Sequence, residues 1–152
     1  MIVYADTSAL ASVYLGDEGD AEWLRQIILA GPDPIVTSEL TDVELLSSLM
    51  RAERERRITH SQLVAGAEAF AADTADDGPI GMLPLTRLTL DTAKECLLAA
   101  NVRSLDAIHI AAARGIGASS DDDVLILTRD ERQGRAAAQL GLSLHPRSAG
   151  SG

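Results

Sequence analysis

Short apolar runs alternate with longer amphipathic stretches along the 152-residue chain. A short apolar run bounded by polar or breaker residues is typical of a buried strand, and apolar residues three and four apart are typical of a helix. The predicted strands are IVYA (2–5), IVT (35–37), VLILT (124–128), LSLH (142–145) and, more weakly, MLPLT (82–86). The predicted helices cover residues 8–15, 17–30, 38–57, 59–72, 90–100, 104–114 and 130–141.

Breaker residues and capping patterns mark the borders between these segments. Residues 31–34, Gly-Pro-Asp-Pro, separate the second predicted helix from the second strand. Thr59 and Gln62 have the spacing of a capping box at a helix start. Pro84 lacks the amide that a central strand must donate, so the strand containing it is expected at a sheet edge. Gly141 is expected to close the last helix.

The alternation of strands and helices indicates the fold class. It predicts an α/β domain with a mostly parallel sheet and helices on both faces. Ligands of such sheets bind in the crevice beyond the carboxyl ends of the strands. Asp6 and Asp130 each follow the end of a predicted strand. We therefore expect the two aspartates to lie at the same edge of the sheet.

Composition narrows the class further. The chain is 46% hydrophobic but only 3% aromatic, so its core must consist of Leu, Ile, Val and Ala. Its length predicts one domain, over residues 1–146, followed by a flexible tail at 147–152. No apolar run is long enough for a membrane span, and no basic segment precedes the first apolar run as in a signal peptide. The single cysteine, Cys96, excludes an internal disulfide and is expected to be buried. Together these features favour a cytoplasmic protein without membrane contact.

The net charge of −10 argues against a surface that simply grips phosphates. Arginine is nevertheless strongly preferred, because one lysine, Lys94, stands against twelve arginines. Four of these arginines lie in RAERERR (51–57), and arginine forks suit phosphate or carboxylate recognition. Glu53 and Glu55 interleave them, so an ordinary solvated helix end explains the segment equally well.

Several carboxylates have both a structural and a functional interpretation. Asp6 and Asp130 can be simple helix N-caps. Asp106 lies in SLDAIHIAAA (104–113), which is apolar on nearly every side and therefore expected to be buried. A buried carboxylate is costly, and the helix dipole behind an N-cap at Ser104 offsets only about 0.3–1 kcal/mol. A cation or several donors should therefore lie nearby, and His109 is interpreted as an orienting or packing residue.

The position of Glu44 on its predicted helix does not identify it as a residue of a functional site. On a helical projection the apolar stripe of this segment comprises Val43, Leu46, Leu49 and Met50, and Glu44 falls on the opposite side. The projection thus predicts a solvated glutamate and does not prefer it over Glu39 or Asp42.

Four motifs connect these residues. They are VYADTSALA (3–11), VTSELTDVELLSSLMR (36–51), RSLDAIHIAAA (103–113) and VLILTRDERQ (124–133). In this order they resemble the PIN domain family and, more narrowly, the VapC-type toxins of bacterial toxin–antitoxin pairs. The resemblance implies a three-layer α/β/α fold with a mostly parallel central sheet and a metal-dependent endoribonuclease activity.

The resemblance also implies the site. Asp6, Glu44, Asp106 and Asp130 match the acidic quartet of the family, as catalytic residues and as ligands of Mg²⁺ or Mn²⁺. Ser8 and Thr128 match its supporting hydroxyl positions. The expected reaction is hydrolysis of an RNA phosphodiester bond that leaves a 5′-phosphate and a 3′-hydroxyl. The loops at 73–81 and 118–123 are longer and more acidic than the usual pattern, and their role stays open.

Four converging carboxylates repel one another strongly unless a cation neutralises them or some stay protonated. Hard oxygen ligands favour Mg²⁺ or Mn²⁺ over zinc. Arginines at the rim are candidates for binding RNA phosphates: Arg51, Arg103, Arg129 and Arg132. The same acidic pocket suits inhibition by an arginine-bearing tail of a VapB-like antitoxin, and the resemblance implies a homodimer.

Two other classes of protein remain as alternatives. A catalytically inactive PIN-like module could serve only as a protein-binding scaffold, although the presence of all four acids disfavours it. A phospho-receiver domain also clusters aspartates at strand ends, but it needs a lysine that follows a strand. Lys94 lies in a predicted helix, which disfavours that class.

Overall fold

The computed structural model describes residues 1–16, 19 and 21–148. Five strands and seven helices follow one another in this part of the chain. They are β1 (Ile2–Ala5), α1 (Thr7–Leu15), α2 (Ala21–Ala30), β2 (Ile35–Ser38), α3 (Leu40–Arg54), α4 (His60–Asp73), β3 (Ile80–Leu83), α5 (Arg87–Ala99), α6 (Ser104–Ser119), β4 (Val124–Leu127), α7 (Glu131–Gln139) and β5 (Ser143–Leu144).

The five strands form one parallel sheet in the order β3-β2-β1-β4-β5. Val3 of β1 pairs with Ile35 of β2 on one side and with Leu125 of β4 on the other. The chain therefore builds the sheet outward from β1 in one direction and then returns to add β4 and β5 on the other side. The change of direction falls between β1 and β4, and a ligand crevice is expected beyond the carboxyl ends of these two strands.

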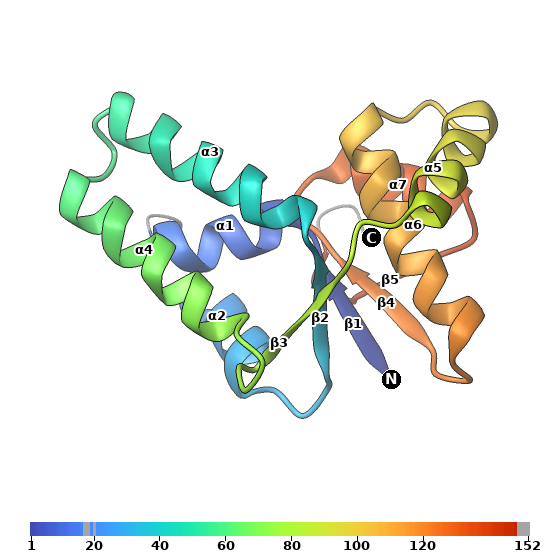
Figure 1. Cartoon of the computed structure of the whole chain (residues 1–152), viewed down its shortest axis with the longest axis horizontal. Coiled ribbons are helices and arrows are strands. Elements are labelled where there is room, and N and C mark those ends of the chain that lie inside the picture. The colour runs from blue at the N-terminus through green and yellow to red at the C-terminus, as the bar shows by residue number, and fades with distance from the viewer. Residues whose placement is uncertain (17–18, 20, 149–152) are drawn as a thin grey trace.

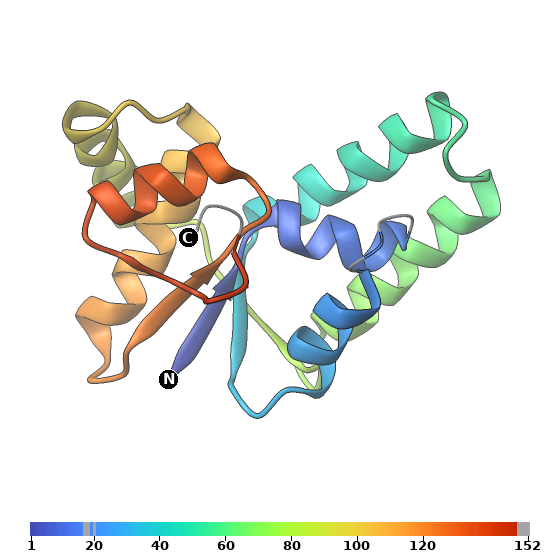
Figure 2. The same ribbon diagram turned by 180° about the vertical axis from the view of Figure 1, so that it is seen from behind.

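Helices cover both faces of the sheet, so the predicted three-layer α/β/α fold is confirmed. Helices α1 to α4 lie on one side and α5 to α7 on the other, as the two opposite views show (Figures 1 and 2). Each face has its own core because side chains of a strand alternate between faces. In β1, Val3 and Ala5 join the core beneath α1 to α4, while Tyr4 joins the core beneath α5 to α7.

Local sequence patterns account for most element borders. Thr59 caps α4 with the predicted capping box, in which both the Thr59 and Gln62 side chains bond to backbone amides. β3 ends at Leu83, directly before Pro84, and lies at the sheet edge as expected. Cys96 is buried, and Gly141 adopts the positive φ of 84° that suits a glycine after the last helix.

Several helix borders differ from the prediction, and α3, for example, ends at Arg54, three residues before the predicted end. α5 begins at Arg87 because Thr86 caps it by accepting from the Thr89 amide. α6 continues to Ser119, five residues beyond the predicted end, so the glycines at 115 and 117 lie within a helix. Ser104 is the first helical residue, and the N-cap position is Arg103, whose side chain makes no capping bond.

The predicted apolar stripe of α3 is confirmed at Leu49 and wrong at its other three positions. The buried residues are Thr41, Leu45, Leu49 and Ala52, whereas Val43, Leu46 and Met50 are 71%, 46% and 45% exposed. Apolar side chains occupy two sides of this helix, and hydrophobicity alone cannot decide which of them packs on α1 and α4. The side with Thr41, Leu45, Leu49 and Ala52 does so, and Val43, Leu46 and Met50 face outward.

The C-terminal segment contacts the domain through residue 148. Ser148 is buried, its hydroxyl donates to the Ile126 carbonyl, and it accepts from the Thr128 amide. The Arg147 guanidinium lies 4.9 Å from the ring centroid of Trp23. The first two residues of the predicted tail therefore pack on the domain. Residues 149–152, like 17, 18 and 20 of the predicted second helix, lie outside the described part.

Within the described residues, no single helix has the length and apolar character needed to cross a membrane. Only α5 and α6 taken together meet that criterion, by length and composition, and they are bent by 117° at their junction.

Candidate active site

A pocket of about 630 Å³ lies at the carboxyl ends of β1 and β4, where the strand order predicts it. Asp6, Glu44, Asp106 and Asp130 all line this pocket. Each carboxylate comes from a different segment: the end of β1, the second turn of α3, the first turn of α6 and the N-cap of α7. Residues far apart in the sequence thus share one cavity.

Asp6 is both a helix cap and a wall of the pocket. Its Oδ1 accepts from the Ala9 amide at 2.9 Å, which caps α1. The Ser8 hydroxyl donates to the same carboxylate at 2.7 Å, and the Thr128 hydroxyl donates to Oδ2 at 2.6 Å. Burial raises the pKa of Asp6, although the nearby His109 and these hydrogen bonds oppose the shift. Ionised Asp6 is therefore a charge that the fold holds at a cost.

Glu44 faces the pocket and not bulk solvent, contrary to the helical projection. Its Oε1 accepts from the Thr7 hydroxyl at 2.8 Å and lies 2.5 Å from Nε2 of His109. Burial raises the pKa of Glu44, but the bond and charge of His109 and the Thr7 bond outweigh it and lower the pKa. Helix position could not reveal this, because the partners come from α1 and α6.

His109 is oriented from behind by Tyr4. Nδ1 of His109 lies 2.7 Å from the Tyr4 hydroxyl, and both residues are buried. Burial raises the pKa of Tyr4, so its hydroxyl keeps its proton, and Ser38 bonds to the same oxygen. The other ring nitrogen, Nε2, lies against Oε1 of Glu44, so Tyr4 and Glu44 together fix the direction of the ring. The interpretation of His109 as an orienting residue agrees with this geometry.

Asp106 and Asp130 share a different partner. Arg103 donates from Nε to Oδ2 of Asp106 at 2.7 Å and from Nη2 to Oδ2 of Asp130 at 2.5 Å. Asp106 is buried, and Arg103 supplies the cation that a buried carboxylate in this position requires. Burial raises the pKa of Asp130, but the Gln133 amide and Arg103 outweigh it and lower the pKa.

The two carboxylate oxygens of Asp130 have different hydrogen-bond partners. Oδ1 accepts from the Arg132 and Gln133 amides and caps α7, while Oδ2 faces Arg103. Ser8 and Thr128, the expected supporting hydroxyls, bond to Asp6 and lie 3.2 Å from each other. The Thr128 hydroxyl also accepts from the Asp130 amide, so it connects the two strand ends.

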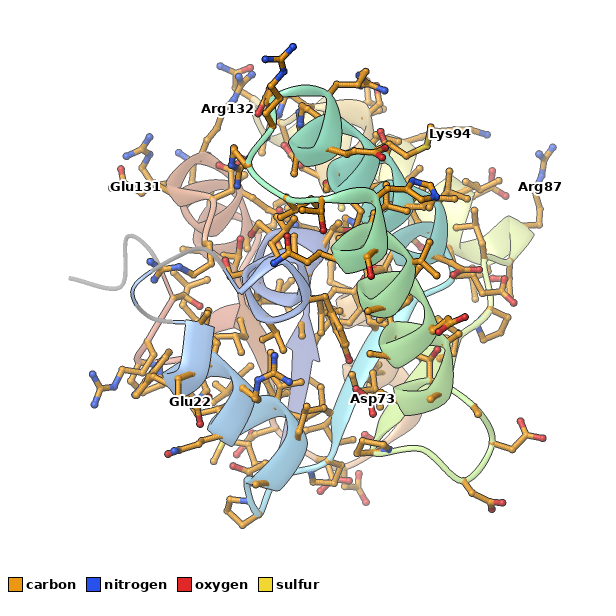
Figure 3. All side chains as sticks on the ribbon, turned by 90° about the vertical axis from the view of Figure 1, so that its left-hand side faces the viewer. Glu22, Asp73, Arg87, Lys94, Glu131 and Arg132 are labelled. Atoms are coloured by element: carbon orange, nitrogen blue, oxygen red, sulfur yellow. The ribbon has the colours of Figure 1, made fainter. Side chains whose placement is uncertain are left out.

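Three of the four expected phosphate-binding arginines line the pocket: Arg51, Arg103 and Arg129. Arg132 does not line it, and its side chain points outward from the start of α7 (Figure 3). Because Arg132 follows the helix cap by two residues, its backbone faces Asp130 while its side chain faces solvent. Arg57, which the sequence pattern grouped with the solvated helix end, lines the pocket instead.

Sequence reasoning missed several other residues that line the pocket or support it from behind. Thr7 and Tyr4 bond to Glu44 and His109, and Gln133 lines the pocket from α7. Nε2 of Gln133 is buried without a hydrogen-bond partner among the described residues. Of these residues, only Gln133 could have been noticed in the sequence, because a glutamine on the buried face of a helix indicates a polar cavity beside it.

The acidic residues suit a hard divalent ion by their chemistry, since all four offer carboxylate oxygens. Asp6 supports this fit, because burial leaves its negative charge costly and a cation would relieve it. In the described part of the chain, however, no three Asp, Glu, His or Cys side chains form a ready ligand cluster. In this structure Arg103 bonds to Asp106 and Asp130, and His109 bonds to Glu44.

The fold and this pocket agree with one family. The model of the PIN domain family matches residues 3–139, so the chain belongs to the PIN domain family. The crystal structure of Mycobacterium tuberculosis VapC20, a sarcin-ricin loop cleaving toxin, resembles the chain with a TM-score of 0.57. The two share 19% sequence identity over 76% of this chain and 83% of VapC20, a level at which the likeness shows the fold. No curated protein matches the sequence significantly.

Proposed function

We propose that the protein is a VapC-like endoribonuclease toxin that hydrolyses RNA phosphodiester bonds with Mg²⁺ or Mn²⁺ as cofactor. One observation carries the proposal: four carboxylates from separate segments line a single pocket at the strand ends of a PIN domain. Family membership supports a nuclease, and the oxygen-only donor set supports a hard divalent ion.

The ligands of the ion are Asp6, Glu44, Asp106 and Asp130, some directly and others through water, as is usual for Mg²⁺. Bound there, a divalent ion would polarise the phosphodiester and offset the charge that develops on the leaving oxygen. The protein's own side chains hold these carboxylates in position. Ser8 and Thr128 fix Asp6, and Thr7 and His109 fix Glu44.

Substrate binding falls to arginines of the pocket wall. Arg51, Arg57 and Arg129 line the pocket and can contact RNA phosphates, which fix the position of the strand without reading its sequence. With few aromatic residues available for stacking, the choice of RNA depends on shape or on a short exposed sequence.

Two partners complete the proposal. The exposed Val43, Leu46 and Met50 of α3 support a protein interface, and we propose a homodimer. The negatively charged pocket supports neutralisation by an arginine-bearing segment of a cognate antitoxin. A monomer in light scattering at micromolar concentration would reject the homodimer.

The function is tested by incubating structured RNAs with the purified protein in Mg²⁺, in Mn²⁺ and in a chelator. We expect cleavage only with a divalent ion, and none by Glu44→Gln. Asp42→Asn is the matched control, since Asp42 lies on the same helix, two residues away, and does not line the pocket. Absence of cleavage by the wild type in either metal would favour the alternative, an inactive PIN-like protein-binding module.

A further inference from the structure

Arg103 occupies a special position in the pocket. It directly precedes α6 and joins two carboxylates that belong to different helices, Asp106 of α6 and Asp130 at the start of α7. Its two bonds use different nitrogens, Nε and Nη2, and both end on Oδ2 atoms. The fork of a guanidinium is suited to holding two oxygens at once. Arg103 therefore provides the cation for two of the four acidic residues.

A divalent ion bound in this pocket would compete with Arg103 for the same two carboxylate oxygens. A divalent ion bound between Asp106 and Asp130 needs carboxylate oxygens that face the pocket, and Arg103 now takes one from each residue. A guanidinium and a divalent ion on the same oxygens would repel each other strongly. The two cations therefore exclude each other.

Arg103 can leave without disturbing the N-termini of α6 and α7. Its side chain is 51% exposed, and it makes no capping bond at the start of α6. Asp130 caps α7 through Oδ1, so loss of the bond at Oδ2 leaves that cap intact. Both helices therefore keep their N-termini when the guanidinium moves away.

We propose that Arg103 is a resident counter-ion of the acidic pocket, which competes with the divalent ion for Asp106 and Asp130 and is released when the ion binds. Once released, Arg103 remains at the pocket wall, where it can bind a phosphate of the RNA. Metal binding and RNA binding thus support each other. This inference rests on the proposed function, because it requires that the pocket takes a divalent ion.

A purely structural ion pair makes the opposite prediction. If Arg103 served to hold Asp106 and Asp130 in position for the ion, its removal would weaken metal binding. If it competes with the ion, its removal strengthens metal binding. The sign of the change in Mn²⁺ affinity separates the two roles, and it needs no RNA and no turnover.

The experiment measures free Mn²⁺ by electron paramagnetic resonance during titration of the wild type, Arg103→Gln and Arg51→Gln. For Arg103→Gln we expect a dissociation constant for Mn²⁺ about threefold to tenfold lower, the range that two partly exposed ion pairs imply. Arg51→Gln removes the same charge from the same pocket and controls for general electrostatics. We expect its change to stay below about twofold, because Arg51 is not ion-paired to Asp106 or Asp130 in the structure.

Each outcome has a distinct meaning. Equal or weaker binding by Arg103→Gln, with clear binding by the wild type, overturns the competition and leaves the proposed function intact. An equal gain in both variants also overturns it, because general charge would then suffice. If neither the wild type nor Arg103→Gln binds millimolar Mn²⁺, the proposed metal dependence falls, and the inference falls with it.

A second measurement uses the unaltered protein and does not depend on the folding of a variant. The Nε–H group of Arg103 is hydrogen-bonded to Asp106, so its proton should exchange slowly with solvent in the absence of metal. Addition of Mg²⁺ should accelerate this exchange, as followed by nitrogen-15 NMR of the arginine side chains. Unchanged exchange of Arg103 at saturating Mg²⁺ would overturn the proposal.

Discussion

The two halves of the acidic pocket are held in different ways. On the side of β1 and α3, Asp6 and Glu44 are bonded by hydroxyls, an amide and the ring of His109. On the side of α6 and α7, Asp106 and Asp130 are bonded by the half-exposed guanidinium of Arg103. The first half is held mostly by buried side chains, whereas the second is compensated by a half-exposed side chain that can move.

This difference shows that different groups hold a carboxylate in position and balance its charge. Buried hydrogen-bond donors fix the direction of a carboxylate, but its burial still makes the charge costly unless a cation balances it. A surface arginine balances charge but is only loosely fixed. A divalent ion would therefore relieve the first half of the pocket and compete for the second.

The strongest test of the comparison is the replacement of Asp106 by Asn. We expect RNA cleavage to fall by more than about a hundredfold, because loss of a direct ligand should exceed the effect typical of outer partners. The fold should persist, since Asn fills the same space, and circular dichroism checks this. Cleavage close to that of the wild type would remove Asp106 from the site.

The next largest effect is expected at His109. Replacement by Gln keeps a donor for Glu44, whereas replacement by Leu removes it, so we expect losses in cleavage of about 10- to 100-fold for His109→Leu and less for His109→Gln. Tyr4→Phe removes only the hydroxyl behind His109, so its cleavage activity should lie between that of His109→Gln and that of the wild type. Equal loss in His109→Gln and His109→Leu would show that packing, and not the bond to Glu44, matters.

Stability in the absence of metal should change in opposite directions in the two halves. The pKa of Asp6 is raised by burial, so its ionisation costs stability, and Asp6→Asn should raise the unfolding free energy by up to about 1 kcal/mol at pH 7. The pKa of Asp130 is lowered, so its charge stabilises the fold, and Asp130→Asn should cost about 0.2–1 kcal/mol. Urea unfolding measures both.

The stability contributions of Asp6 and Asp130 should also depend on pH in opposite directions. Because the folded pKa of Asp6 exceeds the ordinary value of about 3.9, the contribution of Asp6 to stability falls as the pH rises above that value, and the advantage of Asp6→Asn grows from about pH 4 upward. Because the folded pKa of Asp130 lies below that value, its contribution is present above about pH 4 and is lost as the pH falls further. A pH-independent difference for Asp6→Asn would contradict the assigned charge state.

The smallest expected effect concerns Gln133, which lies beside both halves. Its buried Nε2 has no partner among the described residues, so Gln133→Met should leave the unfolding free energy unchanged or raise it by about 1 kcal/mol. A clear loss of thermal stability in this variant would show that the amide is satisfied, for example by a water molecule of the pocket.

Much of the fold could be predicted from local patterns. Short apolar runs located the strands, apolar residues three and four apart located most helices, and Thr59 with Gln62 located the start of α4. The buried Asp106 indicated a nearby cation because an apolar helix cannot hold a carboxylate alone, and Arg103 fulfils that requirement. Neighbouring residues determine these features, so the sequence contains enough information for them.

Other features depend on which surfaces meet in space. Whether α3 buries Leu45 or Leu46 is decided by its packing on α1 and α4, because both residues are equally apolar. The bonds that bring Thr7 and His109 to Glu44, and Arg103 to Asp130, join residues 27 to 65 positions apart. By itself the sequence determined the elements, their order and the acidic residues at the strand ends. Only the tertiary structure decided how each charge is balanced, because that depends on distances between segments that no local pattern encodes.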